Sequence, residues 1–83
     1  MKRIGVIGIV LKDRDHAQDV NRLLSQYAEI IVGRMGVPDK DSGINTIAII
    51  VKGTNEDVSA LTGKLGKFDD VCVKSALTSM EVE

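Results

Sequence analysis

Apolar residues recur along the chain in two nearly equivalent halves. In the first half, closely spaced apolar positions in 3–11 indicate a β-strand. Apolar residues at 17, 20, 24 and 27 follow with the three- and four-residue spacing of an amphipathic helix. The second half repeats the pattern, so that Val6 corresponds to Ile47 and Val20 to Leu61. Each half therefore reads strand, helix, strand.

Two such units in succession give the order β-α-β-β-α-β. The expected strands cover Arg3–Leu11, Glu29–Met35, Asn45–Lys52 and Asp70–Thr78. Residues 36–43 are dense in turn formers and should join the second strand to the third. The sequence predicts an α+β, ferredoxin-like fold with a four-stranded antiparallel sheet and two helices on one face. Residues 1–79 form its single domain, and 80–83 form a frayed tail.

Polar residues and a glycine mark the expected helix ends. Asp13 is the candidate N-cap of the first helix, with Asp15 close behind. Thr54 and Asp57 have the spacing of a capping box at the start of the second helix. Gly66 should end that helix in a left-handed conformation.

The central strands are apolar on both sides, although the helices can cover only one face of the sheet. A second subunit would cover the other face. We therefore expect a homo-oligomer, a dimer or a tetramer, whose interface includes Ile7, Ile9 and Ile50. Central strands also collect apolar residues on both sides in monomers, and that alternative stays open.

Composition narrows the classes of partner. The 83 residues carry 11 basic and 12 acidic side chains, a net charge of −1. This balance provides no excess of positive charge that would attract the phosphates of a nucleic acid. The apolar run Ile4–Leu11 is too short for a membrane span, and no signal-peptide pattern surrounds it. Cys72 is the single cysteine, which suits a reducing compartment. We expect a cytoplasmic protein that contacts neither DNA nor membrane.

No constellation of chemically active residues stands out. His16 and Cys72 are the only residues of their kinds, and the repeat separates them, so no metal site or cofactor is expected. His16 is interpreted as a solvated helix residue and Cys72 as a small, half-buried apolar residue. Tyr27 and Phe68 should pack in the core. A single histidine completes no Ser-His-Asp set, so we expect that the protein is not an enzyme.

Several segments carry a family resemblance, namely Ile4–Asp15, Ile31–Gly36, Leu61–Gly66 and Val71–Ser75. In these the chain resembles the iron-only hydrogenase system regulators, which are similar to the C-terminal regulatory domain of the nickel-responsive repressor and, more distantly, to ACT domains. The resemblance implies an ACT-like fold and a regulatory role in transcription or metabolism. It does not carry over the nickel ligands, because residues 30–35 and 45–52 contain neither His nor Cys. No DNA-reading segment is expected before the first strand.

The candidate ligand site joins the turn after the first strand, Lys12, Asp13 and Arg14, to Arg34 at the end of the second strand. Nearby glycines on both sides of Arg34 would let a ligand approach, and its guanidinium could clamp a carboxylate in bidentate fashion. The alternative is an edge-strand charge that discourages aggregation. We expect an oligomeric sensory module that acts through a small molecule or a partner protein. The alternatives are a structural oligomer without ligand and a dimeric ferredoxin-like enzyme.

Overall fold

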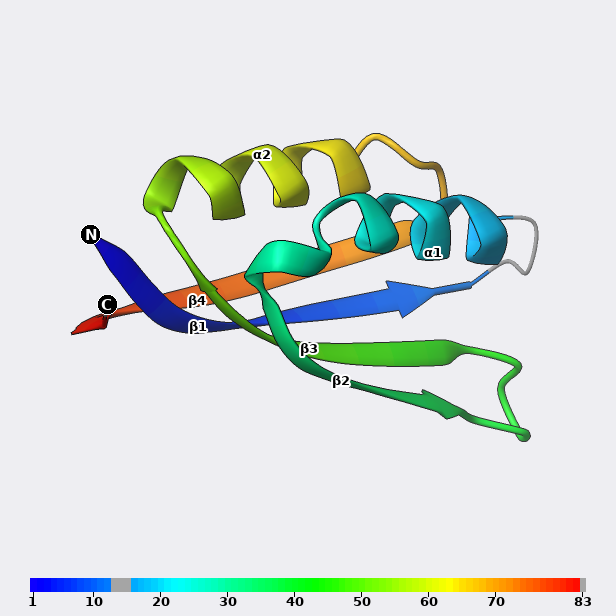
Figure 1. Ribbon diagram of the computed structural model, residues 1–83. Helices are drawn as coiled ribbons and strands as arrows, with labels where there is room; N and C mark the ends of the chain where they lie inside the picture. Colours follow the sequence, from blue (N-terminus) through cyan, green and yellow to red (C-terminus); the bar gives the residue numbers. More distant parts are fainter. Residues whose placement is uncertain (13–15, 83) are drawn as a thin grey trace.

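The computed structural model describes residues 1–12 and 16–82, and within them the predicted order β-α-β-β-α-β is confirmed. The elements are β1 (Lys2–Leu11), α1 (Ala17–Gln26), a short 3₁₀ helix η2 (Ala28–Ile30), β2 (Ile31–Pro38), β3 (Asn45–Gly53), α2 (Asn55–Leu65) and β4 (Val71–Val82). The four strands pair antiparallel in the order β2-β3-β1-β4. Both helices cover the same face of this sheet (Figure 1).

The core lies between the helices and the sheet. Strand register places Ile7 beside Ile49 and Ile9 beside Ile47, and all of these side chains point toward the helices. The buried apolar residues are Ile7, Ile9, Leu11, Val20, Leu23, Leu24, Ile47, Ile49, Val51, Val58, Leu61 and Leu65. Tyr27 and Phe68 pack against this cluster, as the sequence predicted.

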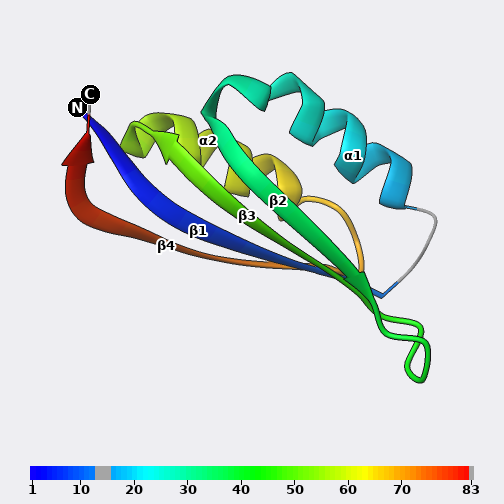
Figure 2. The same ribbon diagram turned by 60° about the horizontal axis from the view of Figure 1, so that its bottom comes forward.

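The opposite face of the sheet carries no helix in the described part of the chain (Figures 1 and 2). Here Val6 lies beside Ile50, and the two side chains are 51% and 48% exposed. Ile7 and Ile9 are 0% exposed and lie under the helices. The grouping of Ile7 and Ile9 with Ile50 on one interface is therefore wrong, because the register puts Ile50 opposite Val6 and on the other side of the sheet.

The start of α2 is held by the predicted capping box. The amide of Asp57 donates to Thr54 Oγ1 at 3.1 Å, and the amide of Thr54 donates to Asp57 Oδ2 at 3.3 Å. Two backbone donors that helix geometry leaves unpaired are thereby satisfied. At α1 the N-cap position is His16, whose side chain makes no capping bond. The proposed caps Asp13 and Asp15 lie outside the described residues.

The end of α2 differs from the prediction. Gly66 has φ −69° and ψ −10°, so it is right-handed, and its amide donates to the carbonyl of Thr62 at 2.9 Å. The left-handed residue comes later, at Asp70, with φ 60°. The carbonyl of Asp70 accepts from the amide of Lys12 at 3.1 Å, which joins the start of β4 to the end of β1.

The prediction of a frayed tail over residues 80–83 is wrong for residues 80–82, which belong to a strand. β4 continues to Val82, which pairs with Lys2, so the start of β1 and the end of β4 lie side by side (Figure 2). The register of β1 against β4 shifts between Arg3 and Gly5. No helix in the described part of the chain is long and apolar enough to cross a membrane.

Candidate functional site

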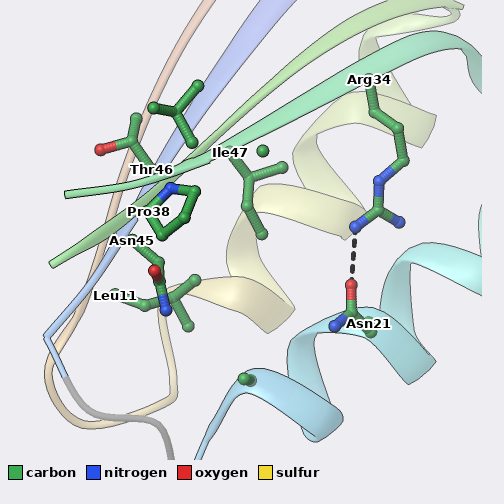
Figure 3. A pocket seen from close by; sticks show the side chains of 10 residues that line it. Leu11, Asn21, Arg34, Pro38, Asn45, Thr46 and Ile47 are labelled. Carbon is green, nitrogen blue, oxygen red and sulfur yellow. Dashed lines mark hydrogen bonds between the residues drawn. The ribbon is translucent and has the colours of Figure 1, made fainter. Parts of the chain in front are cut away.

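A hollow of about 240 Å³ lies between α1 and the end of the β2–β3 hairpin (Figure 3). We call it the α1–β2 cleft; its lining residues are Leu11, Ala17, Asn21, Arg34, Gly36, Val37, Pro38, Asn45, Thr46 and Ile47. Small residues keep it open. Ala17 contributes only a methyl group from α1, and no atom lies within 4 Å of the position that a Cβ on Gly36 would take. A larger residue at position 36 would project over Ile47, its partner in register, and fill the space.

Arg34 supplies the positive charge of the cleft. It lies on the edge strand β2, two residues before Gly36, so its side chain leaves the sheet on the helix side. Its Nη2 donates to Asn21 Oδ1 of α1 at 2.6 Å (Figure 3). Asn21 is a neutral acceptor. Within residues 1–12 and 16–82 no carboxylate forms an ion pair with Arg34.

The remaining walls combine two kinds of surface. Asn45 of β3 is polar, whereas Leu11 and Ile47 form an apolar floor. Thr46 also borders the cleft, but its side chain leaves the sheet on the opposite face, because it neighbours Ile47 in the strand. A guanidinium beside side-chain amides binds carboxylates well, and an apolar floor accepts a short hydrocarbon portion. The arrangement suits a small anion with an apolar part.

The structure brings one of the predicted ligand residues to this cleft. Arg34 lines it, whereas Lys12 is exposed outside the lining and pairs through its backbone with Asp70. Asp13 and Arg14 lie outside the described residues. The sequence analysis missed Asn21, whose only signal is its position four residues after Ala17 on the same face of α1.

His16 and Cys72 lie in different environments. The His16 ring packs 5.5 Å from the Phe68 ring, its Nδ1 lies 3.7 Å from Asp19 Oδ2, and its side chain is 28% exposed. The interpretation of His16 as a solvated residue is therefore wrong, since its ring packs on Phe68 in the segment between α2 and β4. Cys72 is exposed on β4, so the expected half-burial is wrong as well. In the described part of the chain no three metal-ligating side chains gather.

The fold is that of ACT domains. The ACT domain of a GTP pyrophosphokinase from Chlorobium tepidum superposes with a TM-score of 0.76 at 23% identity, covering 92% of this chain and 100% of that chain. A structure described as "putative glycine cleavage system transcriptional repressor" gives a TM-score of 0.69 at 20% identity, covering 100% of this chain and 49% of that chain. At these identities the likeness concerns architecture.

A closer likeness defines the family. The model of the family described as "TM1266-like: Iron-only hydrogenase system regulator, putative" matches residues 3–75. The uncharacterized protein TM1266 from Thermotoga maritima is 35% identical, covers 95% of this chain and 100% of its own, and superposes with a TM-score of 0.89. No curated protein matches the chain. The chain belongs to the TM1266-like family.

Proposed function

We propose that this protein is a regulatory module without catalytic activity that binds a small carboxylate in the α1–β2 cleft. It works as a homo-oligomer, a dimer or a tetramer, and it passes the ligand signal to a partner protein rather than to DNA. The family's description and the ACT-like fold support the regulatory role. The observation that carries the ligand is Arg34, a cation that faces an open cleft and is held by a neutral side chain.

The Arg34–Asn21 hydrogen bond supports binding in two ways. It holds the long side chain of Arg34 against α1, so less conformational entropy is lost when a ligand arrives. It also leaves most of the guanidinium N–H groups available to a carboxylate. Hydrogen bonds to a charged group contribute about 1.5–3 kcal/mol each, so loss of the guanidinium should weaken binding about tenfold or more.

The runner-up function is a structural oligomer that binds no ligand. The exposed apolar residues on the sheet face that carries no helix, such as Val6 and Ile50, favour this function, because they suit assembly whether or not a ligand binds in the cleft. A charged edge-strand residue such as Arg34 would then serve only to discourage further strand pairing. The two functions differ in whether a carboxylate stabilises the folded protein through Arg34.

Thermal unfolding in the presence of small carboxylates tests the proposal. The panel contains α-amino acids and short mono- and dicarboxylates, each beside its uncharged amide. A ligand present at about 100 times its Kd stabilises the native state by about 2.7 kcal/mol, which raises the unfolding midpoint by about 10–20 °C in a protein of this size. We expect at least one carboxylate to do this and its amide to fail.

Matched arginine variants assign the effect to the cleft. Arg34→Gln should abolish the shift, while Arg22→Gln should keep it, because Arg22 is exposed on α1 and pairs with Asp19 outside the cleft. Gly36→Leu should block binding by filling the hollow. A panel without any stabilising carboxylate, or an equal shift in Arg34→Gln, contradicts the ligand proposal and favours the structural oligomer.

A further inference from the structure

Neither the backbone conformation nor the packing within one subunit requires a glycine at position 8. It lies in the middle of β1, a central strand, and its φ is not in the left-handed region. A Cβ added to it would meet only the carbonyl oxygen of Lys74, at 3.9 Å. Gly5 in the same strand is different, since its Cβ would lie 2.8 Å from the carbonyl oxygen of Ala76 and 2.9 Å from Leu77 Cδ1. A glycine inside a strand often marks a bulge, a tight bend, or a place where a ligand or another backbone approaches closely, and the last of these suits the flat centre of this sheet face.

The surroundings of Gly8 form a continuous surface, which we call the open face. The register defines three rows across the sheet: Gly33, Ile50, Val6, Ala76; Met35, Ala48, Gly8, Lys74; and Val37, Thr46, Val10, Cys72. Lys74 is the one charged side chain among these positions. Small residues fill the centre, Gly8 beside Ala48, and larger apolar residues surround them. The surface is therefore a shallow apolar trough.

The size of the open face matches half of a dimer interface. The fractional exposures of its apolar side chains amount to an area on the order of 500 Å², at the upper end for a patch on a monomer. A standard interface buries about 800 Å² on each partner, and about 65% of a homodimer interface is apolar, which again gives about 500 Å². The open face is thus large enough for a stable dimer without further contacts.

We infer that the open face packs against the open face of a second copy, with the two-fold axis parallel to the strands between β1 and β3. This axis lays β4 of one subunit over β2 of the other, so Lys74 packs its hydrocarbon stem on Met35 of the partner subunit and reaches water at the rim. Gly8 then meets Ala48 of the partner subunit, and the two sheets approach closely where both lack large side chains. An axis across the strands would instead stack β4 on β4 and bring the two Lys74 ammonium groups to the same edge.

Sedimentation equilibrium of glycine-to-alanine variants tests the surface. The wild type should be dimeric at micromolar concentration. Gly8→Ala has room for its methyl group within one subunit, so it should keep the native circular dichroism and raise the dimer Kd at least tenfold. Gly63→Ala is the matched control, because Gly63 is exposed on α2 with no atom within 4 Å of its Cβ position; its dimer Kd should not change.

A second variant covers the case in which Gly8→Ala is tolerated by a small shift of the sheets. Ile50→Glu places a charge at a position that is already 48% exposed in one subunit, so the fold should survive and the protein should become monomeric. A monomeric wild type overturns the inference. So does a dimer whose Kd changes in neither Gly8→Ala nor Ile50→Glu.

Cross-linking tests the orientation. Val37 and Cys72 share a row but lie three strands apart in one subunit, about 14 Å, whereas facing sheets are about 10 Å apart. With a bis-maleimide that spans about 10 Å, the Val37→Cys variant should give a covalent dimer joined from position 37 to Cys72 of the partner subunit. The wild type, with Cys72 alone, should give little. Equal cross-linking of the wild type overturns the parallel axis. The inference rests on the proposed homo-oligomer, but none of these results depends on the α1–β2 cleft, so the ligand proposal stands or fails separately.

Discussion

Replacing Ile9 and Ile50 one at a time with alanine separates the two faces of the sheet. The residues are of the same type and lie on the neighbouring strands β1 and β3. Ile9 is 0% exposed beneath the helices, whereas Ile50 is 48% exposed on the open face. The same three carbon atoms are removed in each case, so any difference in the cost reports the environment of the side chain.

The magnitudes follow from burial. At about 0.8 kcal/mol for each buried carbon, Ile9→Ala loses about 2.4 kcal/mol of transfer free energy. The cavity that is left adds to this, so we expect a total loss of about 3–4 kcal/mol. Ile50 is only half buried in one subunit and leaves no closed cavity, so we expect a loss of about 1 kcal/mol.

Urea unfolding followed by circular dichroism measures both losses, at protein concentrations low enough for the monomer to predominate. If a second copy covers the open face, the loss for Ile50→Ala should grow as the protein concentration rises, while the loss for Ile9→Ala should change little. An Ile50→Ala monomer destabilised as much as the Ile9→Ala monomer would refute the assignment of the two faces.

Two local predictions use the same assay. Thr54→Ala removes the capping box of α2 and should cost about 1 kcal/mol, whereas Thr62→Ala within α2 should cost less than about 0.5 kcal/mol; equal losses would contradict the cap. Asp70→Gly relieves the strain of a left-handed backbone at a residue with a Cβ and should stabilise the fold by up to about 1 kcal/mol. Asp69→Gly, at a position where φ is not positive, should destabilise the fold by about 0.5–1 kcal/mol. The reverse order of the two effects would contradict the claim that Asp70 is strained.

The order of the elements could be predicted because each half of the chain carries its own periodicity. The strand alternation and the helix spacing around Val20 and Leu61 are local properties, and their repetition leaves few topologies to consider. The capping box at Thr54 is local in the same sense, since both of its hydrogen bonds lie within four residues.

The wrong predictions concern features that depend on residues far apart in the sequence. Both faces of β1 are apolar, so its pattern does not say which face meets the helices; only the register against β3, which sets Val6 beside Ile50, answers this. The tail was expected to fray because the last residues of a domain are poorly ordered unless something holds them, and here pairing with Lys2 extends β4 to Val82. Gly66 suggested a left-handed cap, and the chain takes that conformation four residues later at Asp70.

The candidate site was predictable only in part for a similar reason. Arg34 stood out because glycines surround it on an expected edge strand. Its partner Asn21 is thirteen residues away in the sequence, and no local pattern joins the two residues. The cleft depends on two residues that are small, Ala17 and Gly36, and a missing side chain gives little signal until the surrounding elements are in place.

The two proposed surfaces meet in one strand. On β2, Arg34 points into the α1–β2 cleft and Met35 points to the open face, because neighbouring residues of a strand leave opposite sides of the sheet. β2 is an edge strand with β3 as its single neighbour, and its register shifts between Ile31 and Gly33, so its position depends on fewer contacts than that of β1. In the proposed function, a carboxylate bound to Arg34 would act on the strand that also carries part of the proposed dimer interface. If both proposals hold and β2 couples them, thermodynamic linkage requires that ligand binding and dimerisation shift each other by the same factor.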